Sequence, residues 1–470
     1  MRKTKIVCTL GPATESFQNI KNLIKAGMNV ARFNMSHGTY EEHRAKIENV
    51  KKAREELDTP ISLLLDTKGP EIRIKTFEKG KICLCDGDKF TLDVADAPGT
   101  KDRISVSYKN LSDSVKCGDQ ILLNDGNIEL KACDVKKGCI VCETVHGGEL
   151  SDQKSINLPN TVIDMPYMSE IDKQDLLFGI AEDVDYIALS FVRSGNDVKN
   201  VRDFLRVNGG EKIQLISKIE NRQGVDNIDG ILEMSDGIMV ARGDMGVEIP
   251  FEELPSIQKM LIRKCYQMGK RVITATQMLE SMINNPRPTR AEISDVANAI
   301  YDGTSATMLS GETAVGKFPF ETVKTMSKIA EKTESSIDFK QKFKNLDVTI
   351  KSITDAVSHS AVAAAYDLKA QAIITVTQSG YTARKVSRFR PDCVIIGATT
   401  DKKVYNQLAL NWGVVPVMSK NQTTSDELFS HSVICAKSTG MVKDGDLVVI
   451  VGSTKVGSSG LTNTLRIENV

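Results

Sequence analysis

The strongest constraint on this chain is a repeat of short aliphatic runs, each followed by a segment with helical spacing. Eight such runs occur, and they span residues 5–11, 29–36, 61–67, 185–192, 213–220, 236–243, 271–277 and 304–311. Strands that alternate with helices predict a parallel sheet, and eight units predict a closed (β/α)8 barrel of the TIM type. An aromatic content of only 5% fits a core built from aliphatic parallel strands.

The repeat is interrupted after the third run and ends after the eighth. The interval carries short β segments, such as 90–95 and 139–145, separated by Gly, Asp and Asn, which predicts an inserted small all-β lid domain. After the eighth run, four further strands alternate with helices and predict an open α/β domain. The predicted domains are therefore a catalytic barrel (1–70 and 168–345), an inserted β-barrel lid (71–167) and a C-terminal α/β regulatory domain (346–470).

Charge and cysteine content exclude several classes of protein. Lys+Arg and Asp+Glu both number 61, which argues against a globally basic nucleic-acid binder and against an acidic disordered chain. The absence of a signal sequence or a long apolar run predicts a cytoplasmic protein with reduced thiols and no membrane span. Cys139 and Cys142 are three apart in a predicted strand and so face opposite sides, which favours structural cysteines over a zinc site.

Polar residues gather at the predicted carboxyl ends of seven strands, where the active sites of such barrels form. Lys218 and Glu220 share one face of their strand, and Asp244 follows the next strand. Two carboxylates without a histidine beside them suit Mg²⁺, and Lys218 and Arg32 add the positive charge that a transferring phosphoryl group requires. No complete Walker loop is present, because the nearest match, 311–318, ends in Phe318 instead of a hydroxyl residue.

Several long motifs resemble the pyruvate kinase family. They are CTLGPATES, ARFNMSHG, LLLDTKGPEIR, LISKIENRQGV, MVARGDMGVEIP, ATQMLESM, NPRPTRAE and MLSGETAVGKFP. The resemblance covers nearly the whole chain. It implies a glycolytic kinase that transfers a phosphoryl group from phosphoenolpyruvate to ADP, giving pyruvate and ATP. It also implies a bacterial type, without the N-terminal extension or additional C-terminal domain of some members.

The resemblance implies roles for the polar residues at the carboxyl ends of the barrel strands and for residues of the inserted segment. Glu220 and Asp244 would bind Mg²⁺ (or Mn²⁺), and Glu71, near the monovalent site, implies dependence on K⁺. The other implied roles are substrate binding by Arg32, Gly243, Asp244 and Thr276, catalysis by Lys218, Arg32, Thr276, Ser310 and Glu312, K⁺ binding by Asn34, Ser36, Asp66 and Thr67, and nucleotide binding by Arg73, Lys154 and His37.

A hydroxyl-rich turn opens a helix in the C-terminal domain, at Thr377, Gln378, Ser379, Gly380, Tyr381 and Thr382. From the residues alone it is either a phosphate-binding turn or an N-capping turn. The resemblance implies a sugar-phosphate effector here, or AMP, with loop 452–464 closing over it and Lys455 on a second phosphate. It also implies a homotetramer. Two residues depart from the family pattern, Asn124 and Asn160, both in or near the lid.

Two other functions share some of these features. A metal-dependent aldolase or lyase on a related pyruvate-binding barrel would share the Glu220 and Asp244 pair. It would not need the lid, Lys154 or the monovalent-cation residues. A non-catalytic sensor of sugar phosphates would show decayed catalytic residues, and none is decayed. ADP-dependent formation of pyruvate distinguishes the kinase from both.

Overall fold

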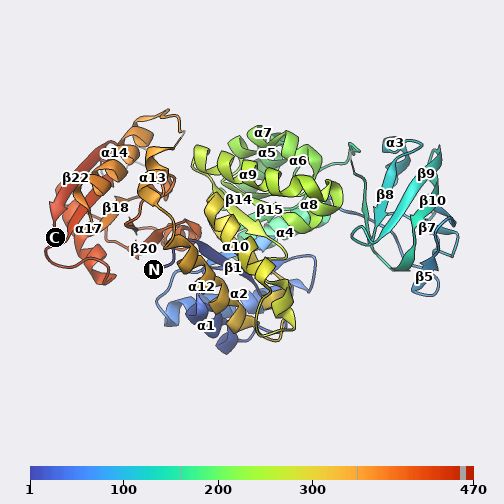
Figure 1. Cartoon of the computed structure of the whole chain (residues 1–470), viewed down its shortest axis with the longest axis horizontal. Coiled ribbons are helices and arrows are strands. Elements are labelled where there is room, and N and C mark those ends of the chain that lie inside the picture. Colours follow the sequence, from blue (N-terminus) through green and yellow to red (C-terminus); the bar gives the residue numbers. More distant parts are fainter. Residues whose placement is uncertain (160, 347, 456–461) are drawn as a thin grey trace.

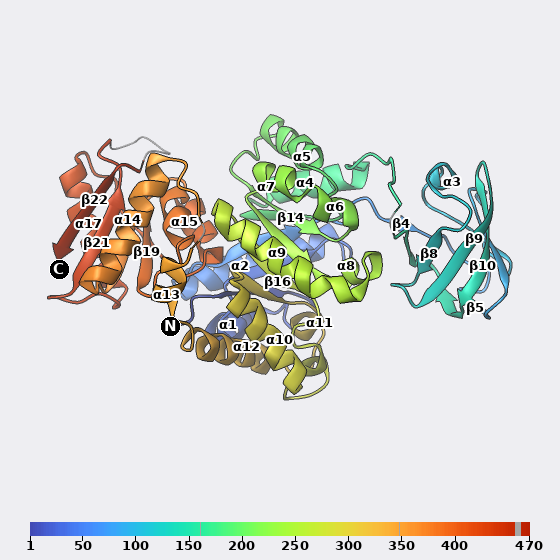
Figure 2. The same ribbon diagram turned by 45° about the horizontal axis from the view of Figure 1, so that its top comes forward.

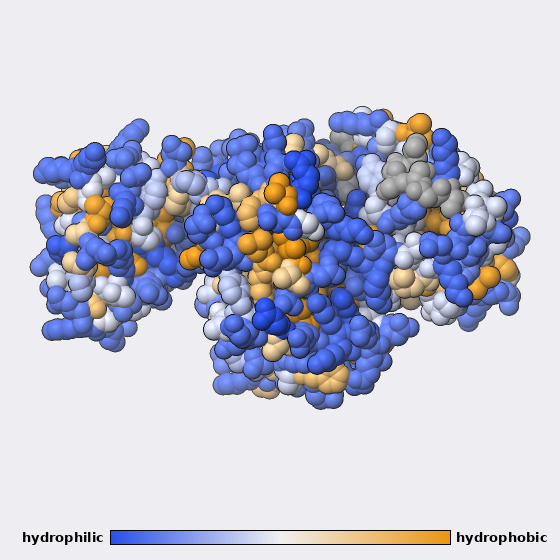
Figure 3. Space-filling view, turned by 180° about the vertical axis from the view of Figure 1, so that it is seen from behind, coloured by the Kyte–Doolittle hydropathy of each residue, from blue (hydrophilic) through white to orange (hydrophobic). Residues whose placement is uncertain are grey.

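The computed structural model describes residues 1–159, 161–346, 348–455 and 462–470. Figure 1 shows three parts in a row, with the barrel in the middle, the β-rich insertion at one end and the C-terminal domain at the other. None of the helices in the described ranges is long and apolar enough to cross a membrane. The face opposite to that of Figure 1 is mostly hydrophilic, with hydrophobic side chains gathered over the barrel (Figure 3).

The barrel is closed by eight parallel strands, as the eight aliphatic runs predict. Each run contains one strand, and nearly every strand residue is buried. The order around the barrel is β1-β17-β16-β15-β14-β13-β3-β2. The strands are β1 (Lys5–Thr9), β2 (Val30–Asn34), β3 (Ser62–Asp66), β13 (Tyr186–Leu189), β14 (Gln214–Ile219), β15 (Gly237–Ala241), β16 (Arg271–Ala275) and β17 (Ala306–Leu309).

Amphipathic helices surround the barrel, and four of them begin with a capping box, at Thr39, Ser169, Ser194 and Thr289. The long helices are α1 (Phe17–Ala26), α2 (Tyr40–Glu56), α4 (Glu170–Ala181), α5 (Gly195–Val207), α9 (Leu254–Met268), α10 (Arg290–Asp302) and α12 (Pro319–Glu334). The shorter ones are α6 (Arg222–Asp226), α7 (Ile228–Met234), α8 (Arg242–Glu248), α11 (Gly311–Ala314), α13 (Phe339–Lys344), η1 (Phe251–Glu253) and η2 (Glu280–Ile283).

The insertion is a small β domain with its own buried core. Its main sheet has the order β4-β12-β8-β9-β10-β6-β7. The outer strands meet where the sheet curls, since Lys75 N–H donates to Ser105 O and Ser107 N–H to Arg73 O, both at 2.8 Å. The elements are β4 (Ile72–Arg73), β5 (Lys81–Leu84), β6 (Lys89–Asp93), β7 (Arg103–Ser105), α3 (Leu111–Ser114), β8 (Gln120–Leu123), β9 (Ile128–Lys136), β10 (Cys139–His146), β11 (Gly148–Ser151) and β12 (Ser155–Asn157).

The C-terminal domain is the predicted open α/β fold, with strand order β20-β19-β18-β21-β22 (Figure 2). The sequence did not indicate its last strand, which runs antiparallel to its neighbour. The elements are α14 (Ile353–Leu368), β18 (Ala372–Val376), α15 (Tyr381–Ser387), β19 (Val394–Thr399), α16 (Lys402–Gln407), η3 (Leu408–Leu410), β20 (Val414–Met418), α17 (Ser425–Ser438), β21 (Leu447–Gly452) and β22 (Thr464–Asn469).

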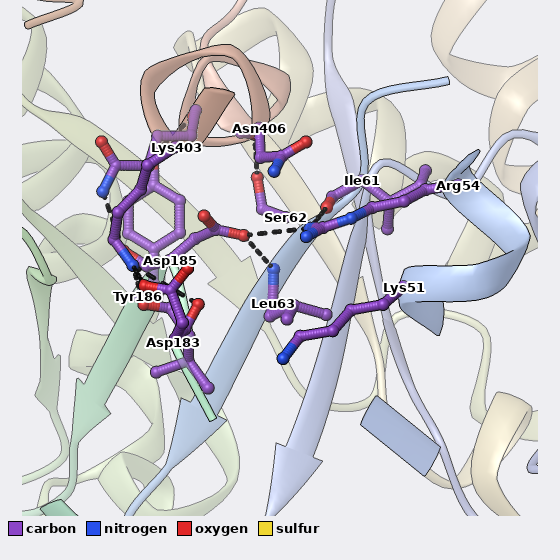
Figure 4. A network of polar contacts seen from close by, with 12 residues as sticks. Lys51, Arg54, Ile61, Ser62, Leu63, Asp183, Asp185, Tyr186, Lys403 and Asn406 are labelled. Atoms are coloured by element: carbon purple, nitrogen blue, oxygen red, sulfur yellow. Dashed lines mark hydrogen bonds and ion pairs between the residues drawn. The ribbon is translucent and has the colours of Figure 1, made fainter. Parts of the chain in front are cut away.

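The C-terminal domain is joined to the base of the barrel, opposite the rim formed by the carboxyl ends of the strands. Leu410 belongs to the same buried cluster as interior barrel residues such as Ile216 and Met239. Tyr186 O–H donates to Gln407 O at 2.6 Å, and Ser62 O–H donates to Asn406 O at the same distance. Figure 4 shows part of this seam, where side chains from the barrel face those from α16.

Candidate functional site

Lys218 is the centre of a buried charge cluster at the carboxyl end of β14. Only 9% of the residue is exposed. Its Nζ lies 2.7 Å from Ser190 Oγ, 2.9 Å from Glu220 Oε1 and 3.2 Å from Asp66 Oδ1. Burial alone would lower the pKa of Lys218, but Asp66 and Glu220 outweigh it and raise that pKa above its ordinary value. The ammonium group is therefore charged and fixed in place.

Asp66 holds two cations of the rim. Its Oδ2 accepts a 2.6 Å bond from Arg32 Nε, and its Oδ1 faces Lys218. Arg32 also donates to Thr9 Oγ1 at 2.9 Å. Burial works against the Asp66 charge, yet Arg32 and Lys218 keep the pKa of Asp66 below its usual value. Two positive side chains from different strands are thus oriented by one carboxylate.

Glu220 and Asp244 offer carboxylate oxygens that suit a metal ion. Glu220 is fully buried, and its Oε2 accepts a 2.6 Å bond from Phe191 N–H. Its Oε1 faces the Lys218 ammonium group, at 2.9 Å from Nζ. Burial, against the opposing charge of Lys218, raises the pKa of Glu220 to about 8. Asp244 lies in the first turn of α8, and no hydrogen bond to its carboxylate occurs within the described residues.

The chemistry of this pair fits Mg²⁺. Within the described ranges, no group of three or more His, Cys, Asp or Glu side chains is arranged to hold a metal. Mg²⁺ is commonly held by one or two carboxylates, with substrate and water oxygens completing its octahedron. Two carboxylates at the rim suit such a site, and among the described residues no thiol or imidazole group joins them, which disfavours zinc.

The loop after β16 is held in an unusual backbone conformation. Thr276 and Gln277 have φ values of 66° and 54°, the left-handed region that non-glycine residues seldom adopt. Arg242 donates to Thr276 O at 2.7 Å and is anchored by an ion pair with Asp295 at 2.7 Å. Gly243 N–H donates to Thr276 Oγ1 at 2.8 Å. The structure thus brings Gly243 and Thr276 together.

Glu312 joins the loops that follow β16 and β17. It is fully buried, and its two oxygens accept hydrogen bonds from Ser310 N–H at 2.7 Å and Leu279 N–H at 3.1 Å. Burial raises its pKa, while these amides oppose the shift. The geometry is that of a group that positions Ser310 and the loop carrying Thr276.

The predicted K⁺ residues lie together at the ends of β2 and β3. Asn34 and Asp66 are partners in the register of these strands. Asn34 Oδ1 accepts from Ser36 N–H at 3.2 Å, and Thr67 O accepts from Ser190 O–H at 2.7 Å. These oxygens belong to neighbouring strand ends, which is the kind of donor set that a hard monovalent cation needs.

The predicted nucleotide residues are less closely assembled. Arg73 pairs with Glu71 at 2.7 Å and donates to Gln153 O at 2.7 Å. Among the described residues, no hydrogen bond or ion pair connects the side chains of Arg73, Lys154 or His37 to Lys218 or Glu220. The sequence alone did not indicate the pairing of Glu71 with Arg73.

The sequence does not predict a specific role for Ser190 and Arg242, two further residues of the rim. Ser190 donates to Thr67 O and accepts from Lys218, so it connects the predicted K⁺ and phosphoryl residues. Arg242 donates to the carbonyls of Ala275 and Thr276, at the end of β16 and just after it. Their position at strand ends was the only signal available, because their partners come from distant segments.

The turn at 377–382 follows β18 and precedes α15. Gly380 has φ 73°, and no side chain caps the helix at this residue. Thr382 Oγ1 lies 2.8 Å from Thr462 Oγ1, so the turn contacts the end of the late loop. The core of that loop, 456–461, lies outside the described residues, as does Asn160. Asn124 has φ 53°, a conformation that asparagine tolerates in turns.

Comparisons with known proteins agree on one family. The family described as "Pyruvate kinase, barrel domain" matches residues 1–323, and "Pyruvate kinase, alpha/beta domain" matches 355–468. The chain is 48% identical to pyruvate kinases of Staphylococcus haemolyticus and Clostridium acetobutylicum, covering all of this chain and 81% and 100% of theirs. It is similar to a crystal structure of a Cryptosporidium parvum pyruvate kinase, with TM-score 0.95 and 38% identity over 100% of this chain and 96% of that one.

Proposed function

The chain belongs to the pyruvate kinase family, and from that premise we propose that it transfers the phosphoryl group of phosphoenolpyruvate to ADP with Mg²⁺ and K⁺ as cofactors. The observation that carries this proposal is the buried cluster at the rim. Arg32 and Lys218 present two fixed positive charges, Glu220 follows β14 directly, and Asp244 lies in the first turn of α8, after β15. Phosphoryl transfer depends chiefly on such positioning and charge stabilisation.

Each rim residue then has a place in the reaction. Glu220 and Asp244 hold Mg²⁺, which when bound neutralises charge on the phosphoryl oxygens. Arg32 and Lys218 bind the phosphoryl group, and Asp66 keeps both cations oriented. The preorganised cluster needs little rearrangement when charge moves during transfer. Gly243, Asp244 and Thr276 hold the substrate carboxylate.

Loss of the phosphoryl group leaves an enolate that must be protonated on carbon. We assign the proton relay to Thr276 and Ser310 acting through water, with Glu312 fixing the backbone of their loops. Thr276 Oγ1 itself donates to Ala275 O at 2.6 Å and accepts from Gly243 N–H. Its hydroxyl is therefore oriented before the substrate arrives.

We assign K⁺ to Asn34, Ser36, Asp66 and Thr67, and the nucleotide to Arg73, Lys154 and His37. Residues 71–167 act as a lid over the rim of a barrel formed by 1–70 and 168–345. Arg73 and Lys154 lie at the strands of the lid that are nearest the barrel in sequence. Closure of the lid would bring these cations toward the bound substrate and exclude water.

Regulation is assigned to the C-terminal domain, 346–470. A sugar phosphate or AMP binds at 377–382, and Lys455 lies on the loop that contacts this turn through Thr462. Gly380, with φ 73°, leaves the start of α15 without a Cβ, so the backbone amides of this turn can approach a phosphate closely. We further propose a cytoplasmic location, which the ten unpaired cysteines fit. We also propose a homotetramer, as membership of the family implies.

One coupled assay tests the proposal. Pyruvate formation is followed with lactate dehydrogenase and NADH while phosphoenolpyruvate is varied, with and without ADP, Mg²⁺, K⁺ and each candidate effector. ADP-dependent pyruvate formation that needs Mg²⁺ and K⁺ is the expected result. Full activity without K⁺, in a buffer with a bulky organic cation, contradicts the K⁺ assignment. Pyruvate formation without ADP favours an aldolase or lyase instead.

A further inference from the structure

A small cavity lined by basic residues lies between the base of the barrel and the C-terminal domain. Its volume is about 20 Å³. Lys270 and Arg271 contribute from the barrel, and Arg384, Arg388 and Arg390 contribute from α15 and the residues after it. The other lining residues are Tyr266, Gly269, Ser305, Ser387, Asn411 and Trp412. None of the described lining residues is acidic.

Several buried donors at this cavity have no acceptor among the described residues. They are Arg271 Nη2, Arg388 Nε, Arg390 Nε, Arg390 Nη1 and Asn411 Nδ2. Arg271 and Asn411 are only 3% and 2% exposed. A buried donor without a partner is costly, and charged donors are the most costly. Five such atoms on four residues around one cavity therefore indicate a missing acceptor.

The acidic groups near the cavity have other partners. Asp355 pairs with Lys385 and Arg388, both at 2.9 Å, and Asp236 pairs with Arg202 at 2.9 Å. Glu334 accepts from the backbone amides of Lys3 and Thr4.

Burial lowers the pKa of the Arg390 guanidinium to about 9 and that of the Arg384 guanidinium to about 10. The local charge balance is thus positive and only partly relieved, for example by the stacking of Arg390 on Trp412 at 4.4 Å.

We propose that this cavity binds one small inorganic anion of halide size, with chloride as its simplest occupant. A cavity of this volume holds about one or two water molecules, so a single halide ion fits in it. Phosphate carries four oxygens around a central atom and needs more room. The anion accepts from Arg390 and Asn411 and connects the barrel to the C-terminal domain. The site is distinct from the rim, and Arg384 connects it to the effector turn by donating to Ser379 O at 3.1 Å.

Crystals of the full chain soaked in bromide test occupancy directly. Anomalous scattering from bromide is expected between the Asn411 amide and the Arg390 guanidinium. Absence of such a peak, in crystals where bromide is found elsewhere, overturns the proposal. The measurement needs neither substrate nor catalytic activity, so it is independent of the proposed reaction.

Thermal unfolding gives a second test. Chloride replaces gluconate at fixed ionic strength and fixed K⁺, and the Tm of the wild type is expected to rise by about 2 °C by about 0.2 M chloride. Asn411→Asp replaces the unpartnered donor by a carboxylate oxygen and so supplies the missing negative charge within the chain. This variant is expected to unfold at a higher Tm than the wild type without halide, and to lose the chloride response.

Asn200→Asp, at an exposed position on α5, introduces the same charge away from the cavity and should keep the full chloride response. A wild-type Tm that does not respond to chloride overturns the proposal. A chloride response of the Tm that persists in Asn411→Asp also overturns the proposal. A response to phosphate with none to chloride would overturn the halide assignment.

Discussion

At the scale of single residues, Lys218 is the group on which the proposed reaction most depends. Asp66, Glu220 and Ser190 fix its ammonium group from three sides. A side chain with that many oriented partners is preorganised for one task, and its charge can act on a phosphoryl group without first being desolvated. The same contacts mean that a neutral replacement removes charge but leaves the metal ligands in place.

Lys218→Met is therefore expected to lower kcat by about 10³-fold or more, while Mn²⁺ still binds. The coupled assay measures turnover, and the electron paramagnetic resonance of Mn²⁺ measures binding. Lys199→Met, at an exposed position, serves as the control and should retain full turnover. Turnover close to wild type in Lys218→Met would contradict its assigned role.

Asp185 is a buried carboxylate at the seam with the C-terminal domain (Figure 4). It accepts from Leu63 N–H at 2.8 Å and lies 3.7 Å from Arg54. Burial raises its pKa to about 6, although Arg54, the Leu63 amide and Lys403 oppose the shift. The folded state therefore binds this proton more tightly than the unfolded state does. The contribution of Asp185 to stability falls as pH rises from about 4 to about 6.

Asp185→Asn removes this titration. Relative to the wild type, the variant is expected to gain stability of order 2 kcal/mol between about pH 4 and pH 7, seen as a growing Tm difference. Asp226→Asn changes an exposed carboxylate at the end of α6, away from this seam, and should show no such trend. A Tm difference for Asp185→Asn that stays constant over this pH range would show that Asp185 does not carry the effect.

At the scale of elements, η3 closes the base of the barrel. Leu410 is fully buried among interior barrel residues, although it belongs to the C-terminal part of the chain. Leu410→Ala is expected to cost about 3 kcal/mol of unfolding free energy, because the rigid barrel cannot collapse around the cavity. Leu368→Ala, at a residue 48% exposed on α14, should cost less than about 0.5 kcal/mol. Denaturant unfolding that shows equal costs for the two would contradict this role of η3.

The same element shows what the sequence could and could not predict. Each barrel unit carries local signals, an aliphatic run and often a capping residue such as Thr39 or Thr289, so each unit can be recognised from its own segment. Residues 402–410 have helical spacing, which predicts α16 and η3, but the insertion of Leu410 into the base of the barrel and the antiparallel pairing of β22 depend on contacts with distant segments. Helices α6 and α7 are too short for a helical period to show.

The contacts of the candidate site likewise include some that the sequence predicts and some that it cannot predict. The sequence places Lys218 and Glu220 on one strand face because strand periodicity is local. It cannot show that Glu312 accepts from the Leu279 amide, or that Arg390 and Asn411 meet at one cavity. Those contacts join residues that only the tertiary fold brings together.

At the scale of the whole molecule, the lid enters and leaves the barrel at one place. Gly69 N–H donates to Asp172 at 2.9 Å, and Tyr167 O–H donates to Ser190 O at 2.8 Å. The lid has its own buried core. Its contacts with the barrel include Asn157 with Glu248 at 2.9 Å and the Met165 carbonyl with Arg193 at 2.7 Å. An insertion with adjacent ends and a separate core can be removed without opening the barrel.

Replacement of residues 71–165 by a short Gly/Ser linker is therefore expected to leave the barrel and the C-terminal domain folded, with circular dichroism showing a cooperative thermal transition. Turnover should be lost, because Arg73 and Lys154 leave with the lid and water reaches the rim. Mn²⁺ should still bind, since Glu220 and Asp244 remain. Normal ADP-dependent turnover in this variant would mean that the rim works without a lid. Loss of Mn²⁺ binding would mean that the lid holds the metal ligands in place.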